Sequence, residues 1–125
     1  MLIKQLLFIF IGGGLGSVLR FGIGQLLSNF QHQAVFPWGT FSVNIIGSFL
    51  IGFLLASELR SDQEWNLIKS FLIIGFCGGF TTFSSFAYEN FHLIKEGQFG
   101  LFAIYAVSSL ILGLSAVYLG WRIQD

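Results

Sequence analysis

Polar side chains recur at helical spacing within two otherwise apolar stretches. The members of each set lie four residues apart: Thr40, Asn44 and Ser48 in one stretch, and Tyr105 and Ser109, followed at the same interval by Gly113, in the other. Residues four apart share one helical face, and their hydroxyl and amide groups donate hydrogen bonds without carrying a full charge. Such a donor track suits a small anion that is partly desolvated and then released, because conduction needs weak binding. The alternative for Asn44 is an interhelical hydrogen bond worth about 0.6 kcal/mol.

Two phenylalanines and a carboxylate follow at similar spacing in a third stretch. Phe83 and Phe86 lie three residues apart, and Glu89 lies one turn beyond Phe86. An aromatic ring has a positive edge, so ring edges turned toward a pathway would help to stabilise a small anion. Ordinary packing against lipid or core is the alternative for both rings. A carboxylate inside a membrane is a candidate functional group by default, although Glu89 could also lie at the interface near His92 or Lys95.

Arg20 is the one basic residue well inside an apolar stretch. Three interpretations of this residue are open. Its long apolar stem could carry the guanidinium to the membrane interface. Otherwise the guanidinium could bond backbone carbonyls, or it could draw anions toward a vestibule.

A break is predicted in the middle of a membrane-length run that carries no charge, residues 70–88. The centre of the run holds three glycines, which have low helix propensity: Gly75, Gly78 and Gly79. Thr81 and Thr82 are candidates to cap a new helix that starts near Phe83. An unwound turn inside a bilayer persists only within protein or beside an ion or water. Freed carbonyls and helix ends at such a break are a recurring way to bind ions.

Small residues four apart predict close helix contacts. Three such pairs occur: Gly12 and Gly16, Ser48 and Gly52, and Gly75 and Gly79. Each pair could pack within one chain or between two copies of it. Four slender helices can hardly enclose a permeation path, so assembly of copies is a reasonable expectation.

The composition is that of an integral membrane protein. The chain has 125 residues, of which 54% are hydrophobic and only 10% are charged, whereas soluble domains carry roughly 25% charged residues. Mean hydropathy is +0.79. The net charge is zero, so nothing suggests nucleic acid or an acidic partner. Cys77 is the single cysteine, which excludes an internal disulfide, and no Cys/His spacing typical of metal sites occurs.

The apolar runs predict an all-α fold with four transmembrane helices in a single domain over residues 1–125. A spanning helix needs about 20 mostly apolar residues. The expected ranges are 2–27, 37–57, 65–95 with a break near 78–82, and 98–122. Pro37 is expected in the first turn of the second helix, where proline is favoured. We expect a multi-pass protein of the cell (inner or plasma) membrane.

The basic residues barely decide the orientation of these helices. One side of the membrane would carry four basic residues, Lys4, Arg60, Lys69 and Arg122, and the other would carry two, Arg20 and Lys95. This positive-inside bias is weak. A nearly balanced count permits insertion in both orientations and therefore an antiparallel dimer, while one fixed orientation remains open on charge alone.

The motifs resemble those of the CrcB-type fluoride channels, the Fluc family. The resemblance rests on Gly12-Gly13-Gly14-Leu15-Gly16 with Arg20, on the segment 39–47 (GTFSVNIIG), and on the segment 75–86 (GFCGGFTTFSSF). It spans all four expected helices, and the third motif is the most specific. The resemblance implies a fluoride-selective channel for passive export, built as an antiparallel, dual-topology homodimer with two pathways.

The resemblance also assigns residues. It implies that Asn44, Phe83 and Phe86 line each pathway, and that further polar residues continue it: Thr40, Glu89, Tyr105 and Ser109. It implies a structural sodium ion (Na⁺) on the dimer axis, bound by backbone carbonyls of Gly78 and Thr81, and a structural or vestibular role for Arg20. One departure is Gly113, where the family pattern leads us to expect another hydroxyl; Ser108, Ser115 or a water is expected to substitute.

Two other classes compete with a channel. A small multidrug exporter also has four short helices, but it needs a carboxylate in the first helix, and residues 2–27 contain no Asp or Glu. An accessory membrane subunit would use its glycines for packing alone, and it would have little need for a broken helix or aligned polar faces. The sequence shows no set of residues that resembles a catalytic nucleophile with its base and orienting group, so we do not expect an enzyme.

Overall fold

The computed structural model describes residues 1–30, 35–57 and 62–124, and its regular structure is helical throughout. The elements run in chain order: α1 (Leu2–Phe30), α2 (Trp38–Leu55), α3 (Gln63–Lys69), the π-helical segment η1 (Ser70–Cys77), α4 (Gly78–Phe80), α5 (Phe83–Lys95) and α6 (Phe99–Gln124). Four spans are long and apolar enough to cross a membrane, the third running from Gln63 to Lys95. The predicted all-α fold with four transmembrane helices is confirmed.

The helix bounds differ from the expected ones in two informative places. Residue Pro37 lies immediately before α2 and not in its first turn, because its backbone has a non-helical ψ of 72°. Helix α2 also ends at Leu55, two residues before the expected end at Ser57. The second span is therefore shorter than α1 and α6, which have 29 and 26 residues against 18.

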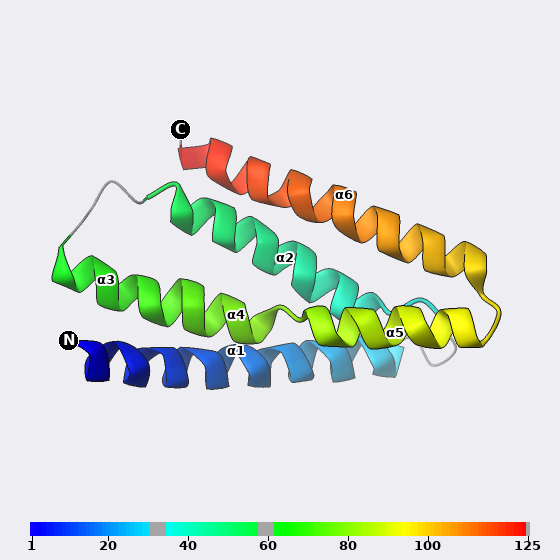
Figure 1. The fold of residues 1–125 in the computed structure, drawn as a ribbon, viewed down its shortest axis with the longest axis horizontal. Helices are drawn as coiled ribbons and strands as arrows, with labels where there is room; N and C mark the ends of the chain where they lie inside the picture. The colour runs from blue at the N-terminus through cyan, green and yellow to red at the C-terminus, as the bar shows by residue number, and fades with distance from the viewer. Residues whose placement is uncertain (31–34, 58–61, 125) are drawn as a thin grey trace.

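Two helix pairs form the bundle (Figure 1). Helix α1 runs along η1 and α4, and helix α2 runs along α6. Helix α5 continues beyond the break and packs on α6 and α2. The break therefore lies at the point where the two pairs meet.

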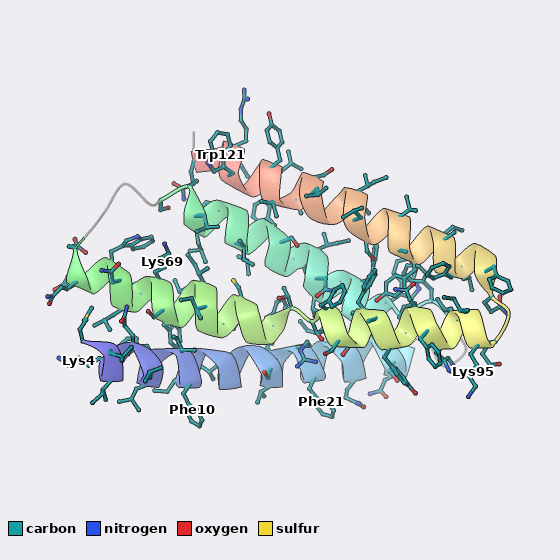
Figure 2. The ribbon with its side chains drawn as sticks, viewed as in Figure 1. Lys4, Phe10, Phe21, Lys69, Lys95 and Trp121 are labelled. Atoms are coloured by element: carbon teal, nitrogen blue, oxygen red, sulfur yellow. The ribbon has the colours of Figure 1, made fainter. Side chains whose placement is uncertain are left out.

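Large apolar side chains cover the outside of the bundle. Phe10 and Phe21 point away from α1 (Figure 2) and are 79% and 67% exposed. Lys4 and Lys95 lie at opposite ends of the long axis in the same view. A continuous apolar surface between charged ends is what a lipid-facing protein presents. The chain is a multi-pass membrane protein.

The third span is broken at Thr81 and Thr82, within the range 78–82 predicted for the break, whereas the glycines that the sequence singled out remain helical. Both threonines are extended, with ψ of 157° and 121°, whereas Gly78 keeps helical angles of −62° and −39°. The hydroxyl of Thr82 accepts a hydrogen bond of 3.2 Å from the Ser85 backbone N–H, as an N-cap does. The predicted cap therefore marks the break, while the glycines serve another purpose.

The glycines bring the backbone of α1 against that of η1 and α4. A Cβ built on Gly16 would lie 2.8 Å from the Phe80 nitrogen, and one built on Gly75 would lie 2.8 Å from the Ile9 oxygen. Real Cβ atoms do not approach backbone this closely. The first and third small-residue pairs therefore interlock within one chain, which decides between the two possibilities left open for them. The second pair also packs internally, because Gly52 faces Val117 of α6.

Replacing Gly16 with alanine should destabilise this contact. The added methyl would force α1 away from α4, and overpacking of this kind typically costs about 1–3 kcal/mol. Gly14→Ala is the matched control, because a Cβ at Gly14 meets nothing within 4 Å. We expect the thermal denaturation midpoint in detergent to be lower for Gly16→Ala than for the wild type. The midpoint of Gly14→Ala should not be lowered. Equal midpoints for the two variants would contradict the close contact.

Candidate functional site

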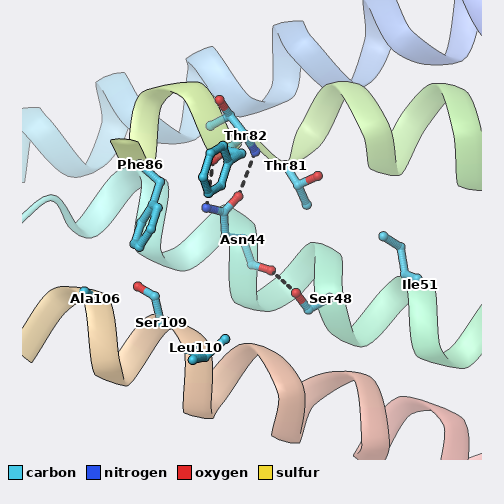
Figure 3. Close-up of a pocket in the computed structure, with 10 residues that line it drawn as sticks. Asn44, Ser48, Ile51, Thr81, Thr82, Phe86, Ala106, Ser109 and Leu110 are labelled. Carbon is cyan, nitrogen blue, oxygen red and sulfur yellow. Dashed lines mark hydrogen bonds between the residues drawn. The ribbon is translucent and has the colours of Figure 1, made fainter. Parts of the chain in front are cut away.

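The break is held open by the side chain of Asn44 from α2. Its Nδ2 donates to the Thr82 carbonyl over 3.0 Å, and the Thr82 N–H donates to Asn44 Oδ1 over 2.8 Å (Figure 3). The amide thus satisfies both backbone polar groups of Thr82, which hydrocarbon could not do. Ser48, one turn further along α2, donates to the Asn44 carbonyl over 2.6 Å. The alternative considered for Asn44, hydrogen bonding between helical segments, is therefore present, and it consists of two hydrogen bonds to Thr82.

A pocket of about 500 Å³ opens beside this turn. Figure 3 shows its lining, which comes from α2, the break, α5 and α6: Asn44, Ser48, Ile51, Thr81, Thr82, Phe83, Phe86, Ala106, Ser109 and Leu110. The hydroxyl oxygen of Ser109 is buried and has no hydrogen-bond partner among the described residues. A buried hydroxyl of this kind is a donor that a ligand or water can use. The structure therefore brings together four residues predicted for the pathway from three separate stretches: Asn44, Phe83, Phe86 and Ser109.

The two phenylalanines differ in their surroundings. The ring centroids of Phe83 and Phe86 are 6.0 Å apart at 41°. Phe86 also lies 5.0 Å from the Tyr105 ring at 62°, which is an edge-to-face contact. Phe83 is 79% exposed on the surface of the single chain. Phe86 is thus fixed by α6, while Phe83 is free to contact another molecule.

The Glu89 carboxylate lies inside a three-helix cluster next to Phe86. The Thr40 hydroxyl from α2 donates to its Oε1, and the Tyr105 hydroxyl from α6 donates to its Oε2 over 2.8 Å. Charge-assisted bonds to both oxygens are the usual way to keep a carboxylate away from water. Its hydrogen-bond partners within the described chain are these two hydroxyls, and not the nearby His92 or Lys95 considered for it. The predicted polar residues Thr40, Glu89 and Tyr105 therefore converge.

Arg20 reaches from α1 to the end of α4. Its Nε donates to the Gly79 carbonyl over 2.9 Å, so the contact with a backbone carbonyl, one of the three interpretations, is present. The guanidinium also lines a pocket of about 300 Å³ together with Ser17, Gln25 and Thr40. One residue thus supports the helix end beside the break and contributes positive charge to a polar pocket.

The break leaves backbone carbonyls at the end of α4 without their helical partners, and those of Gly78 and Thr81 are among them. In a continuous helix, the Gly78 and Thr81 oxygens would accept from the N–H groups of Thr82 and Ser85. These two N–H groups donate instead to Asn44 Oδ1 and to the Thr82 hydroxyl. The regular donors of both carbonyls predicted as cation ligands are therefore diverted, and carbonyl oxygens freed in this way are suitable for a hard cation such as sodium.

Two features of the site were not found from the sequence. Asn90 is 7% exposed and donates from Nδ2 to the Phe86 carbonyl over 2.9 Å; its position four residues after Phe86 was the available signal. Opposite Gly113 lies Ser48, whose hydroxyl would be 3.8 Å from a Cβ at that glycine. Ser108, expected to substitute for the missing hydroxyl, donates instead to the Ile104 carbonyl of its own helix. Ser48 is the better placed hydroxyl.

Comparison with known proteins gives a consistent family assignment. Residues 7–121 match the family described as CrcB-like protein, Camphor Resistance (CrcB). A relative from Bacteroides fragilis, named fluoride-specific ion channel FluC, is 48% identical over 120 residues, covering 94% of this chain and 93% of the relative. Proteins of the same name from Azobacteroides pseudotrichonymphae and Thermus thermophilus are 42% and 43% identical; their alignments cover 99% and 96% of this chain, and 98% and 94% of the relatives.

The match extends through all four spans and through the pocket beside the break. The resemblance drawn from the glycine, asparagine and phenylalanine motifs is therefore confirmed at the level of the family. The chain belongs to the CrcB-like protein family.

Proposed function

We propose that the protein is a fluoride-selective ion channel that lowers intracellular fluoride by passive export. The observation that carries this proposal is the convergence of uncharged donors and aromatic rings, Asn44, Ser109, Phe83 and Phe86, on one pocket beside the helix break. The names of the relatives support fluoride as the ion. A channel is not an enzyme, and no catalytic step is part of this proposal.

Each lining group has a role that follows from its chemistry. The Asn44 amide keeps one N–H beyond the bond to Thr82 and can donate it to an anion. The Ser109 hydroxyl can donate in the same way, and ring edges of Phe83 and Phe86 offer positive potential without a charge. Tyr105, Thr40 and Glu89 continue the polar track from Phe86. Weak donors suit passage, because a buried arginine in their place would hold a small anion too tightly.

Passive export suffices for fluoride because of its acid chemistry. Hydrogen fluoride is a weak acid that crosses lipid in its neutral form and dissociates at neutral internal pH. The anion then accumulates inside the cell, and an open pathway lets it leave down its gradient. The proposal therefore requires no nucleotide and no second transported ion.

We further propose an antiparallel homodimer with two pathways. The pocket is open at the surface of the single chain, where Phe83 is 79% exposed, so a second copy would complete its wall. Among the described residues, the near balance of basic groups also permits both orientations: Lys4, Lys69 and Arg122 belong to one side, and Arg20 and Lys95 to the other. Arg60, which was counted with the first group, lies outside the described residues.

The carbonyls of Gly78 and Thr81 are proposed to bind a structural sodium ion on the dimer axis. Their fit rests on the diversion of their helical donors to Asn44 and Thr82. The ion, when bound, would supply positive charge to oxygens that have lost their helical donors. The side chains of Asn44 and Thr82 would hold those oxygens in place for it.

Removal of sodium should lower the stability of the dimer. Binding to the folded state adds stability by mass action, about 2.7 kcal/mol at a concentration 100 times the dissociation constant. We expect the thermal denaturation midpoint in detergent to fall when sodium is replaced by N-methylglucamine, and to recover when sodium is added back. Rubidium, a larger cation, serves as the control. Identical midpoints in all three media would contradict this assignment, provided that flame photometry finds no retained sodium.

Fluoride efflux from liposomes tests the function directly. Purified protein is reconstituted into vesicles loaded with fluoride or with chloride, and ion release is followed with selective electrodes. We expect rapid fluoride release without chloride release. A folded dimer that releases neither ion would favour the accessory-subunit hypothesis instead.

A further inference from the structure

Another pocket, of about 300 Å³, lies at the far end of α5 beyond Glu89. Its polar lining consists of Tyr88, Glu89, His92 and Glu96. Glu89 belongs both to this pocket and to the cluster with Thr40 and Tyr105. The cluster therefore separates the pocket beside the break from the pocket at the helix end.

Helix α5 contributes residues to both pockets. Phe83, Phe86, Glu89 and His92 follow one another at intervals of three residues, and Glu96 lies four beyond His92. Successive members of this series are neighbours on the helix surface. Glu89, His92 and Glu96 share one face, whereas Phe83 lies on the opposite side of the helix from His92, because each step of three residues turns the face by about 60°. The 13 residues of α5 extend about 20 Å, which is more than half of a bilayer's hydrocarbon thickness. The helix thus runs from the break to the membrane edge, and Glu89 lies between the two pockets along it.

We propose that this pocket is the mouth of the fluoride pathway at the α5 end, and that His92 and Glu96 control anion access to it. This inference rests on the proposed function. It assigns two residues beyond the polar track, and it names the ligand class as a small monovalent anion arriving from water.

The charges at the pocket carry the argument. Glu89 and Glu96 are both carboxylates, but Glu89 has each oxygen bonded to a hydroxyl, whereas Glu96 is exposed. The Glu96 carboxylate therefore lowers the local concentration of anions, and a charged group near a mouth changes access in this way. Lys95, its neighbour in the sequence, is the nearby basic residue, and the described lining from residues 35–37 carries no charge.

His92 supplies the compensating donor. An imidazole carries an N–H donor in either protonation state. Its ring stacks on Tyr88 with centroids 6.4 Å apart at 16°, which fixes its orientation. An anion that passes Glu96 therefore meets a donor before it reaches the Glu89 cluster.

The test measures initial fluoride efflux at low fluoride in roughly 10 mM and roughly 1 M salt, where the Debye lengths are about 30 Å and 3 Å. A unit charge about 10 Å away in water changes the local anion concentration about twofold. In low salt we expect Glu96→Gln to conduct about twofold faster than the wild type and Glu96→Lys about fourfold faster. His92→Glu should conduct at least twofold slower. In high salt the Glu96 variants should match the wild type.

Glu64→Gln is the matched control, because this exposed carboxylate lies in the first turn of α3, away from the α5 pocket. It should conduct like the wild type at both salt concentrations. Efflux that is unchanged in the Glu96 and His92 variants, or changed equally at both salt concentrations, would overturn the mouth assignment while leaving the channel intact. A wild type that conducts no fluoride would overturn the proposed function itself.

Discussion

Phe86→Ile and Phe83→Ile are each expected to lower fluoride efflux at least tenfold in a protein that remains a folded dimer. Isoleucine keeps an apolar side chain of similar size, but it has no ring edge and therefore no directed positive potential. An increase of about 1.4 kcal/mol in the free-energy barrier to passage makes the rate ten times slower. Phe86 is held against Tyr105 with centroids 5.0 Å apart, so this substitution should also cost some stability. The measurement is fluoride efflux from liposomes per folded dimer.

Phe10→Ile provides a closely matched control for Phe83→Ile. Both phenylalanines are 79% exposed in the single chain, but Phe10 points outward from α1 toward lipid (Figure 2). We expect Phe10→Ile to conduct like the wild type. If the Phe83 and Phe86 variants both conduct normally, the ring-edge argument is wrong.

Asn44→Ala is expected to reduce both stability and efflux. The substitution leaves the N–H and the carbonyl of Thr82 without their partners of 2.8 and 3.0 Å. Each unsatisfied buried group costs about 1–3 kcal/mol, so the thermal denaturation midpoint should fall clearly. The freed Thr82 N–H would also be able to return to the Gly78 carbonyl, which removes the diversion on which the proposed sodium site depends. Efflux should fall at least tenfold because the donor at the pocket is lost as well.

Asn66→Ala separates this effect from the general removal of an asparagine. Asn66 is exposed on α3, and its replacement should change neither stability nor efflux. Normal efflux per folded molecule in Asn44→Ala, despite lower stability, would restrict Asn44 to a structural role. Normal stability would contradict the two hydrogen bonds themselves.

The proposed fluoride pathway consists of residues that could be selected from the sequence because of their type. An uncharged amide, hydroxyls at four-residue intervals and a carboxylate are conspicuous in apolar stretches, since each is costly in hydrocarbon without a reason. Asn44, Glu89 and Ser109 were identified on this basis. Their partners were not predictable, because Thr82 lies 38 residues from Asn44 and the distance between such residues depends on how whole helices pack.

The position of the break also depends partly on residue type, which the sequence gives, and partly on helix packing, which it does not. Helix propensity correctly indicated that the third span is interrupted, but it favoured the glycines as the cause. In the structure Gly75 and Gly79 remain helical and let α1 approach, while extended Thr81 and Thr82 form the turn. Helix propensity describes how well a residue fits into a helix that has little tertiary contact. It does not include the neighbouring backbone that makes a glycine useful within a helix.

By itself the sequence determined the class of protein, the four spans, the existence of the break and the residue types that face it. These follow from hydropathy and from intervals along the chain, which are local properties. Only the tertiary structure decided that Asn44 closes on Thr82, that Thr40 and Tyr105 share Glu89, and that Arg20 supports α4. The physical reason is that each of these contacts joins different helices, and its geometry depends on the close packing that all the interface residues allow together.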